Sequence, residues 1–276
     1  MGMTINTNVL SINAQRNADA NSNSLATSLQ RLSSGLRVNS AKDDAAGLAI
    51  ASKMDSQARG MNVAIRNSND GISLVQTAES GMAVIGDMMQ RMRELAVQAT
   101  NGTNTSGDLS AINQEYSQLW SEINRTMSSV QFNSTSLLNA TSAFTFQIGA
   151  NSGQTVSIAS SDISITAGVG GMSGASALNT TTTSANASAI DAISTAISAI
   201  NSSRATLGAI QNRFNYTVSF LQSASENQQA ARGRIMDADF AQETSNLSRA
   251  QILQQAGTAM VAQANQLPQG VLALLR

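Results

Sequence analysis

The chain contains no cysteine and no histidine, only one proline, 3% aromatic residues and 12% charged residues. Without cysteine or histidine it can form no Ser-His-Asp triad, no cysteine nucleophile, no thiolate or imidazole metal site and no disulfide. The charged share is about half that of an ordinary soluble domain, while the apolar share is ordinary. These absences favour a structural or binding protein over an enzyme, and they imply no metal and no cofactor.

Two further classes of partner are disfavoured. The formal net charge is −1, and no basic cluster provides the positive surface that nucleic acid requires. The longest clearly apolar run, residues 271–275, is far shorter than the roughly 20 residues that span a bilayer. Residues 1–6 (MGMTIN) have neither a positive n-region nor an apolar h-region, so no signal peptide is visible. We therefore expect neither nucleic acid nor a membrane as a partner.

What is present is helical periodicity. Five segments carry apolar residues three and four positions apart, which is typical of amphipathic helices: 5–36, 45–99, 109–130, 190–230 and 247–274. The stripe of the second segment contains Met61, Ile65, Ile72, Val75, Met82, Ile85, Met89, Met92 and Leu95. A helix of that length measures about 80 Å, so it must lie against other helices. Pro268 either kinks the last helix or ends its ordered part.

The period changes between the third and fourth helices. Phe144, Phe146 and Ile148 alternate with polar residues, a turn follows at 150–153, and the alternation resumes, which predicts a β-hairpin over 143–159. Residues 160–189 are rich in Ser, Thr, Ala and Gly, and we expect this tip to be exposed and poorly ordered. Its glycine-rich part, 168–174, lacks the lysine of a P-loop and is interpreted as a flexible loop.

Several local features have structural interpretations. The turn at 101–107 is expected to be followed by a cap from Ser106 or Asp108. Asp43 or Asp44 is expected to cap the helix that begins near residue 45, since adjacent carboxylates with no third ligand make a poor metal site. The methionine-rich face of Met82, Met88, Met89 and Met92 is interpreted as core and not as a binding groove.

The predicted fold is mainly α, a long antiparallel helical rod or coiled-coil bundle with one small β-hairpin region. The terminal helices are expected to pair antiparallel and to carry apolar stripes that need partners beyond the monomer. The residues expected to drive this polymerisation are Leu25, Leu29, Leu32, Leu36, Leu253, Met260, Leu267, Val271 and Leu274. The sequence thus predicts a self-assembling helical protein.

Three longer motifs carry a family resemblance. They are LSSGLRVNSAKDDAAGLAIA at 32–51, FQIGANSGQTVSI at 146–158 and ANQLPQGVLALLR at 264–276. In this order they resemble bacterial flagellin, the subunit of the flagellar filament. The resemblance covers nearly the whole chain except about 160–189, so the chain is similar to a short form without large outer domains.

The resemblance implies an organisation in two domains. Residues 1–44 and 235–276 would form an inner domain of terminal helices, which become the filament core on assembly. Residues 45–234 would form an outer helical domain that carries the hairpin 143–159 and the low-complexity tip 160–189.

The resemblance also implies a location and partners. The location is extracellular, in the filament, reached by unfolded export through the flagellar type III apparatus without a cleaved signal peptide. A chain with no disulfide and one proline suits such passage, because disulfide reshuffling and proline isomerisation are slow. The implied partners are other copies of the chain, the hook–filament junction proteins, the filament cap and an export chaperone that covers about 236–276.

One segment resembles the part of flagellins that Toll-like receptor 5 of vertebrate hosts recognises. It is QRMRELAVQ at 90–98, where Arg91 and Leu95 match, with Glu115 supplied by the next helix. Arg91 and Leu95 are four residues apart, so they share one helix face and are expected to present a cation beside an apolar side chain. The alternative interpretation is that this face packs against neighbouring subunits.

Three other functions agree less well with the sequence. A hook–filament junction protein shares flagellin-like ends, but the matched C-terminal motif speaks against it. A hydrolase domain grafted into the middle would have only about 30 inserted residues and neither histidine nor cysteine for its chemistry. A cytoplasmic coiled-coil scaffold would be expected to carry charged e and g positions, which the low charge content does not supply.

Overall fold

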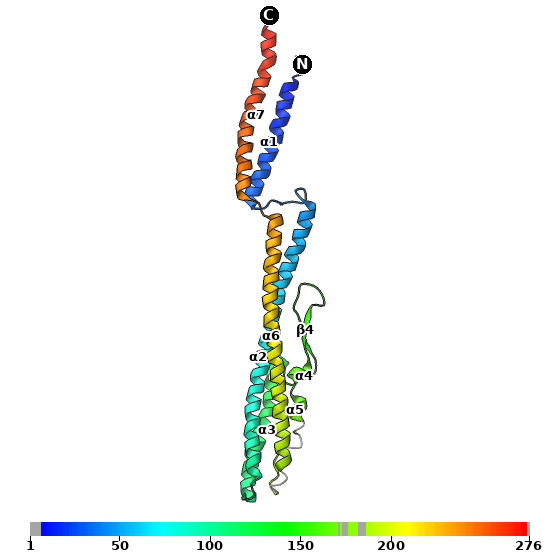
Figure 1. The fold of residues 1–276 in the computed structure, drawn as a ribbon, viewed down its shortest axis with the longest axis vertical. Coiled ribbons are helices and arrows are strands. Elements are labelled where there is room, and N and C mark those ends of the chain that lie inside the picture. Colours follow the sequence, from blue (N-terminus) through cyan, green and yellow to red (C-terminus); the bar gives the residue numbers. More distant parts are fainter. Residues whose placement is uncertain (1–6, 171, 173–175, 182–185, 275–276) are drawn as a thin grey trace. The chain divides into compact units, whose positions relative to one another are not determined.

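The computed structural model describes the backbone of residues 7–170, 172, 176–181 and 186–274, and the side chains of these residues except at 167 and 267–274. Seven helices and four short strands occur in this described part (Figure 1). In chain order they are α1 (Val9–Ser34), α2 (Ala45–Ala99), α3 (Ser106–Ser129), β1 (Gln131–Phe132), β2 (Thr135–Ser136), β3 (Phe144–Gln147), β4 (Thr155–Ile158), α4 (Ser160–Ile163), α5 (Thr166–Gly170), α6 (Ala187–Met236) and α7 (Phe240–Leu274). The predicted mainly helical fold with little β-structure is confirmed.

The long helices match the periodic segments closely. Helix α2 begins and ends where its stripe predicted, at Ala45 and Ala99. Helices α6 and α7 are longer than expected, since both begin before their first strongly periodic residues. Helix α7 continues past Pro268 to Leu274, so this proline does not end it.

The chain divides into two units, which are described separately. The first unit contains residues 1–56 and 227–276, and the second contains residues 57–226. The two boundaries between the units, after residues 56 and 226, fall inside α2 and α6, so each of these helices contributes to both units.

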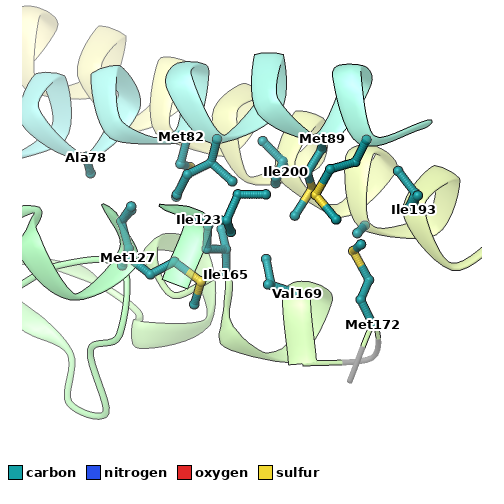
Figure 2. Packing of buried hydrophobic residues seen from close by; sticks show 14 of the residues in the cluster. Ala78, Met82, Met89, Ile123, Met127, Ile165, Val169, Met172, Ile193 and Ile200 are labelled. Carbon is teal, nitrogen blue, oxygen red and sulfur yellow. The ribbon is translucent and has the colours of Figure 1, made fainter. Parts of the chain in front are cut away.

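The second unit is built on a continuous apolar core. Its largest fully buried side chains come from all three long helices, including Met82 and Met89 of α2, Ile123 of α3 and Phe214 of α6. Figure 2 shows how Met82, Met89 and Ile123 converge with other side chains of this core, with α2 and α6 above and the chain around α5 below. The methionine face is therefore core, as predicted, because Met82, Met89 and Met92 are 0% exposed, and Met88 is partly buried and packs against them.

The expectation of an exposed, poorly ordered tip over 160–189 is wrong for the residues that the structure describes. Short helices α4 and α5 form there, and their neighbourhood contributes buried apolar side chains to the core: Ile163, Ile165, Val169, Met172 and Leu178. The buried Asn186 side chain accepts a hydrogen bond from the backbone N–H of Asn179 at 2.7 Å. Residues 171, 173 and 174 of the glycine-rich loop lie outside the described residues.

Two antiparallel hairpins complete this unit. The predicted hairpin is confirmed as β3 and β4, paired from Phe144 opposite Ile158 to Gln147 opposite Thr155. A second, smaller hairpin of β1 and β2 was not predicted; its turn residues Asn133 and Ser134 have positive φ angles of 49° and 63°. Phe146 of β3 packs edge-on against Phe214, with ring centroids 5.6 Å apart.

The first unit has a much smaller core. Helices α1 and α7 lie side by side (Figure 1). Outside this helix pair, Val38, Ala51 and Met236 form one small buried apolar cluster. The N-terminal end of α1 lies near the C-terminal part of α7, because the Asn8 side-chain amide donates to the carbonyl oxygen of Ala264 at 2.7 Å. The terminal helices therefore pair antiparallel.

Candidate assembly and recognition surfaces

The seam between α1 and α7 is made of small and polar residues. Its buried members are Ser11, Ser28, Glu243, Ala250 and Ala264, each less than 9% exposed. The Ser11 hydroxyl donates to the side-chain oxygen of Asn265 at 2.7 Å, and Arg31 lies 3.9 Å from Glu243. Such contacts define the register of the two helices but remove little apolar surface from water.

Many of the large apolar side chains of this helix pair are instead exposed. Exposed fractions are 64% for Val9, 57% for Leu10, 55% for Ile12, 48% for Leu29, 66% for Ile252, 43% for Leu253 and 64% for Met260. Several of these side chains would contribute about 1.5–3 kcal/mol each if they became fully buried. The helix pair thus presents an unpartnered apolar surface in the single chain.

Among the residues predicted to drive polymerisation, three of those with described side chains lie on this surface. Leu29, Leu253 and Met260 are exposed. Leu25 and Leu32 are half-buried, and Leu36 packs beside the small cluster of Val38 and Met236. The side chains of Leu267, Val271 and Leu274 lie outside the described residues.

The motif at 32–51 forms a hydrogen-bonded junction after α1. Gly35 ends the helix in the left-handed region, with φ +71°, and its backbone N–H donates to the carbonyl oxygen of Arg31 at 2.8 Å. Leu36 pairs with Asp237 in an isolated antiparallel bridge. The Arg37 guanidinium donates to the carbonyl oxygen of Ile235 at 2.7 Å, near the C-terminal end of α6, where a cation is favourable.

The two aspartates of this motif stabilise local backbone, as predicted. Asp44 caps α2, because its side chain accepts from the Gly47 N–H at 2.8 Å. A Cβ at Gly47 would overlap the Asp44 carboxylate, so a larger residue there would require the capping side chain to shift. Asp43 accepts hydrogen bonds from the Ser40 hydroxyl and from the backbone N–H groups of Ser40 and Asn39, which lower its pKa.

The cap of α3 differs from the expectation. Thr105, and not Ser106, is the N-cap, and Asp108 is its reciprocal partner. The Asp108 N–H donates to the Thr105 hydroxyl oxygen at 3.3 Å, while the Asp108 carboxylate accepts from the Thr105 N–H at 2.9 Å. The carboxylate also accepts from the Thr105 hydroxyl, and these hydrogen bonds lower the pKa of Asp108.

The predicted recognition residues are brought together only in part. Arg91 of α2 lies 2.9 Å from Glu115 of α3 and 2.9 Å from Glu94 one turn along α2. Hydrogen bonds to Glu94 and Glu115 raise the pKa of Arg91. The three side chains remain about half exposed or more, so they form an accessible charged trio.

Leu95 does not lie in that trio. It is 2% exposed and belongs to the core between the long helices. The expectation of an exposed apolar side chain beside Arg91 is therefore wrong for the single chain. The exposed apolar residue of this turn is Val97, which is 49% exposed.

Sequence reasoning missed one exposed aromatic pair. Tyr216 and Phe220 of α6 are 78% and 70% exposed. They are four residues apart and lie off the buried stripe that contains Phe214 and Leu221, so they share a second face of the helix. Aromatic residues at i and i+4 outside the apolar stripe were the signal available in the sequence.

The described part of the chain contains neither a membrane-spanning helix nor a cluster of metal ligands. Over residues 7–170, 172, 176–181 and 186–274, no helix is both long and apolar enough to cross a bilayer. Within the same ranges, the acidic side chains form no group of three that could hold a metal ion.

Comparison with known families matches most of the chain. Residues 5–143 match the bacterial flagellin N-terminal helical region, and residues 190–275 match the bacterial flagellin C-terminal helical region.

Individual relatives match over their full lengths. The chain is 48% identical over 275 residues to a flagellin of Halalkalibacterium halodurans, covering 99% of this chain and 100% of that relative. It is 43% identical over 286 residues to the flagellar filament 33 kDa core protein of Treponema phagedenis, again covering 99% and 100%. Among solved structures, the crystal structure of Bacillus cereus flagellin is similar, with a TM-score of 0.51, 31% identity, and coverage of 60% of this chain and 94% of that one.

Proposed function

Because the chain belongs to the bacterial flagellin family and is a structural subunit of the flagellar filament, we propose that it assembles through its terminal helices. In this proposal residues 1–44 and 235–276 form the inner domain of the filament, and residues 45–234 form the outer domain. The observation that carries it is the apolar surface of α1 and α7, exposed beside a polar seam. Packing of copies would bury that surface and supply the free energy that orders the helices.

The test of this proposal is seeded assembly of the purified chain, observed by electron microscopy. Filaments of uniform diameter that grow from sheared seeds are expected. A chain that stays monomeric under every seeding condition would contradict the proposal and favour a junction protein. The double variant Leu253→Asn/Met260→Asn should lose assembly, whereas Val84→Asn, an equally exposed site on α2, should keep it.

The partners during export are part of the same proposal. The chain would leave the cell unfolded through the flagellar type III apparatus, with a chaperone on about 236–276, and would meet the hook–filament junction proteins and the filament cap. The physical reason for a chaperone is that exposed Ile252, Leu253 and Met260 would otherwise promote premature association. Deletion of 245–276 should abolish both polymerisation and chaperone binding, and filaments formed by the truncated chain would refute this.

A second proposed function is recognition of the monomer by Toll-like receptor 5. The paired, exposed side chains of Arg91 and Glu115 support it, since a cation held at a fixed position is typical of an interface hot spot. Leu95 would act as a positioning residue, because its burial holds the turn of α2 that carries Arg91.

Three single substitutions separate these roles. Arg91→Ala and Glu115→Ala should lower receptor activation by about ten-fold or more with unchanged thermal unfolding. Leu95→Ala should lower receptor activation too, but only together with a loss of thermal stability. Arg125→Ala is the matched control, because Arg125 is also an exposed arginine, paired with Glu122 on α3. Unchanged activation in Arg91→Ala would remove the recognition assignment.

A further inference from the structure

The turn that joins α2 to α3 (Figure 1) contains the one Asn-Gly pair of the sequence, Asn101–Gly102. Both residues are exposed. The Asn101 N–H donates to the carbonyl oxygen of Gln98 at 3.2 Å, and the Asn104 side-chain amide donates to the same oxygen at 2.7 Å. The pair therefore lies in a turn that is both water-accessible and held by hydrogen bonds.

The side chain of Asn101 is folded back on the backbone that follows it. Its oxygen, Oδ1, accepts a hydrogen bond from the Thr103 N–H at 3.4 Å. The hydrogen-bonded ring of this Asx-turn includes the peptide bond between Asn101 and Gly102. The amide carbon of the side chain, Cγ, is therefore held near the Gly102 nitrogen, and the hydrogen bond to Oδ1 makes that carbon more electrophilic.

The backbone nitrogen of Gly102 is available as a nucleophile. Its N–H has no hydrogen-bond partner among the residues that the structure describes. Glycine also lacks a side chain that would hinder the approach of this nitrogen to Cγ. Asn104 in the same turn is different, because the next N–H, that of Thr105, donates to the Asp108 carboxylate at 2.9 Å. The turn therefore distinguishes Asn101 from Asn104.

We propose that Asn101 is a site of self-modification, at which the Gly102 nitrogen attacks the Asn101 side chain. A bond forms between this nitrogen and Cγ, the bond from Cγ to Nδ2 breaks, and the proton lost by Gly102 leaves, through water, on the departing ammonia. A second water molecule then opens the cyclic succinimide at one of its carbonyl groups. The product is aspartate or isoaspartate at position 101, and water is the co-reactant.

The reaction changes both the charge and the backbone of the turn. Either product places a carboxylate just after the C-terminal end of α2, where negative charge is unfavourable. Isoaspartate also adds one carbon to the backbone before Thr105, the N-cap of α3. Because ammonia is lost, water does not reverse the change, and the modified fraction should increase with the age of the chain.

The first experiment incubates the purified full chain at about pH 8 and follows the tryptic peptide of residues 94–125 by mass spectrometry. A mass increase of about 1 Da at Asn101 is expected, because a side-chain NH₂ is replaced by OH. The other asparagines of this peptide, Asn104, Asn113 and Asn124, should stay intact. Asp-N protease, which cleaves before aspartate but not before isoaspartate, separates the two products.

Gly102→Ala is the matched variant. A Cβ at Gly102 would meet nothing within 4 Å, and Gly102 is not in the left-handed region, so alanine should leave the turn intact. The substitution should nevertheless slow the modification by about ten-fold or more, because the methyl group hinders the attacking nitrogen. Circular dichroism checks that the helix content of the variant equals that of the wild-type chain.

A second measurement follows the effect on α3. The modified chain carries an extra negative charge, so ion exchange separates it from the unmodified chain. Its amides at 105–109 should then exchange with deuterium faster than those of the unmodified chain, because the cap of α3 is disturbed. Identical exchange in the two chains would contradict this consequence for α3.

The outcomes do not depend on filament assembly. An unchanged mass at Asn101 after incubation for weeks would overturn the inference, and so would equal rates in the wild-type chain and Gly102→Ala. Modification of Asn104 as fast as Asn101 would also overturn it, since exposure alone would then determine the reaction. A failure of seeded assembly would bear on the proposed function and not on this site.

Discussion

The two units of this chain use the same kind of element, the long helix, with opposite distributions of apolar surface. The second unit buries thirty described residues in one apolar cluster, whereas the small cluster of the first unit contains three. The first unit exposes many of its large apolar side chains and buries small or polar residues in the seam between α1 and α7. Burial within the chain stabilises the second unit, whereas in the proposed assembly burial between chains would stabilise the terminal helices of the first.

The largest expected effect of this difference is on local unfolding. In the free monomer, backbone amides of α1 and α7 should exchange with deuterium orders of magnitude faster than those of α2 between residues 74 and 99, because few apolar contacts oppose opening of the terminal helices. Hydrogen exchange with mass spectrometry measures this. Equal protection in the two units would contradict the comparison, and protection of α1 and α7 should appear on assembly.

The second largest expected effect is the loss of stability caused by a core substitution in the second unit. Phe214 is fully buried and packs against Phe146, so Phe214→Ala should lower the free energy of unfolding of the second unit by about 3–5 kcal/mol. Phe220→Ala, six residues along the same helix but 70% exposed, should change it by less than about 0.5 kcal/mol. Chemical denaturation of the monomer tests both. Similar losses in the two variants would mean that α6 is not packed as described.

A smaller effect is expected on the free energy of unfolding at alkaline pH. Burial raises the pKa of Tyr116 to about 12, from an ordinary value of 10.0. Between these pH values the unfolded chain has lost the phenolic proton and the folded chain retains it. The contribution of Tyr116 to the free energy of unfolding is therefore fully present below pH 10 and is lost as the pH rises toward 12. The loss should reach about 2–3 kcal/mol. Tyr116→Phe should remove this dependence, and denaturation at pH 9 and pH 11.5 compares the two chains.

The helix caps give the smallest effect. Thr105→Ala removes the cap of α3 in the second unit and should lower the free energy of unfolding by about 1 kcal/mol. Asn8→Ala removes the corresponding cap of α1, where the Asn8 side chain accepts from the Ser11 N–H at 3.1 Å. It should leave global unfolding unchanged and only speed exchange in α1. A loss of global stability in Asn8→Ala would show that α1 unfolds together with the second unit.

The fold was predictable where apolar residues repeat regularly. The apolar stripe from Met61 to Leu95 was sufficient to place α2, because a continuous stripe needs no knowledge of the partner helix. The tip was not predictable in the same way. Ile163, Ile165 and Val169 are isolated in Ser- and Thr-rich sequence, and their burial depends on long helices that are distant along the chain.

The recognition residues show a conflict within the sequence itself. The spacing of four residues placed Leu95 beside Arg91, while the apolar stripe placed Leu95 in the core. Burial prevailed, because a buried leucine contributes about 1.5–3 kcal/mol and an exposed neighbour of Arg91 contributes nothing comparable. The pairing of Arg91 with Glu115 also required the register of α2 against α3, which periodicity alone does not define.

The distribution of methionine has a chemical consequence. Met82, Met89 and Met92 are 0% exposed, whereas Met260 on α7 is 64% exposed. Oxidants convert accessible methionine to the polar sulfoxide, which disrupts apolar contacts and is reversible by reductases. In the free chain, oxidation should therefore reach the thioether of Met260 well before those of Met82, Met89 and Met92, which the bundle of α2, α3 and α6 shelters from peroxide.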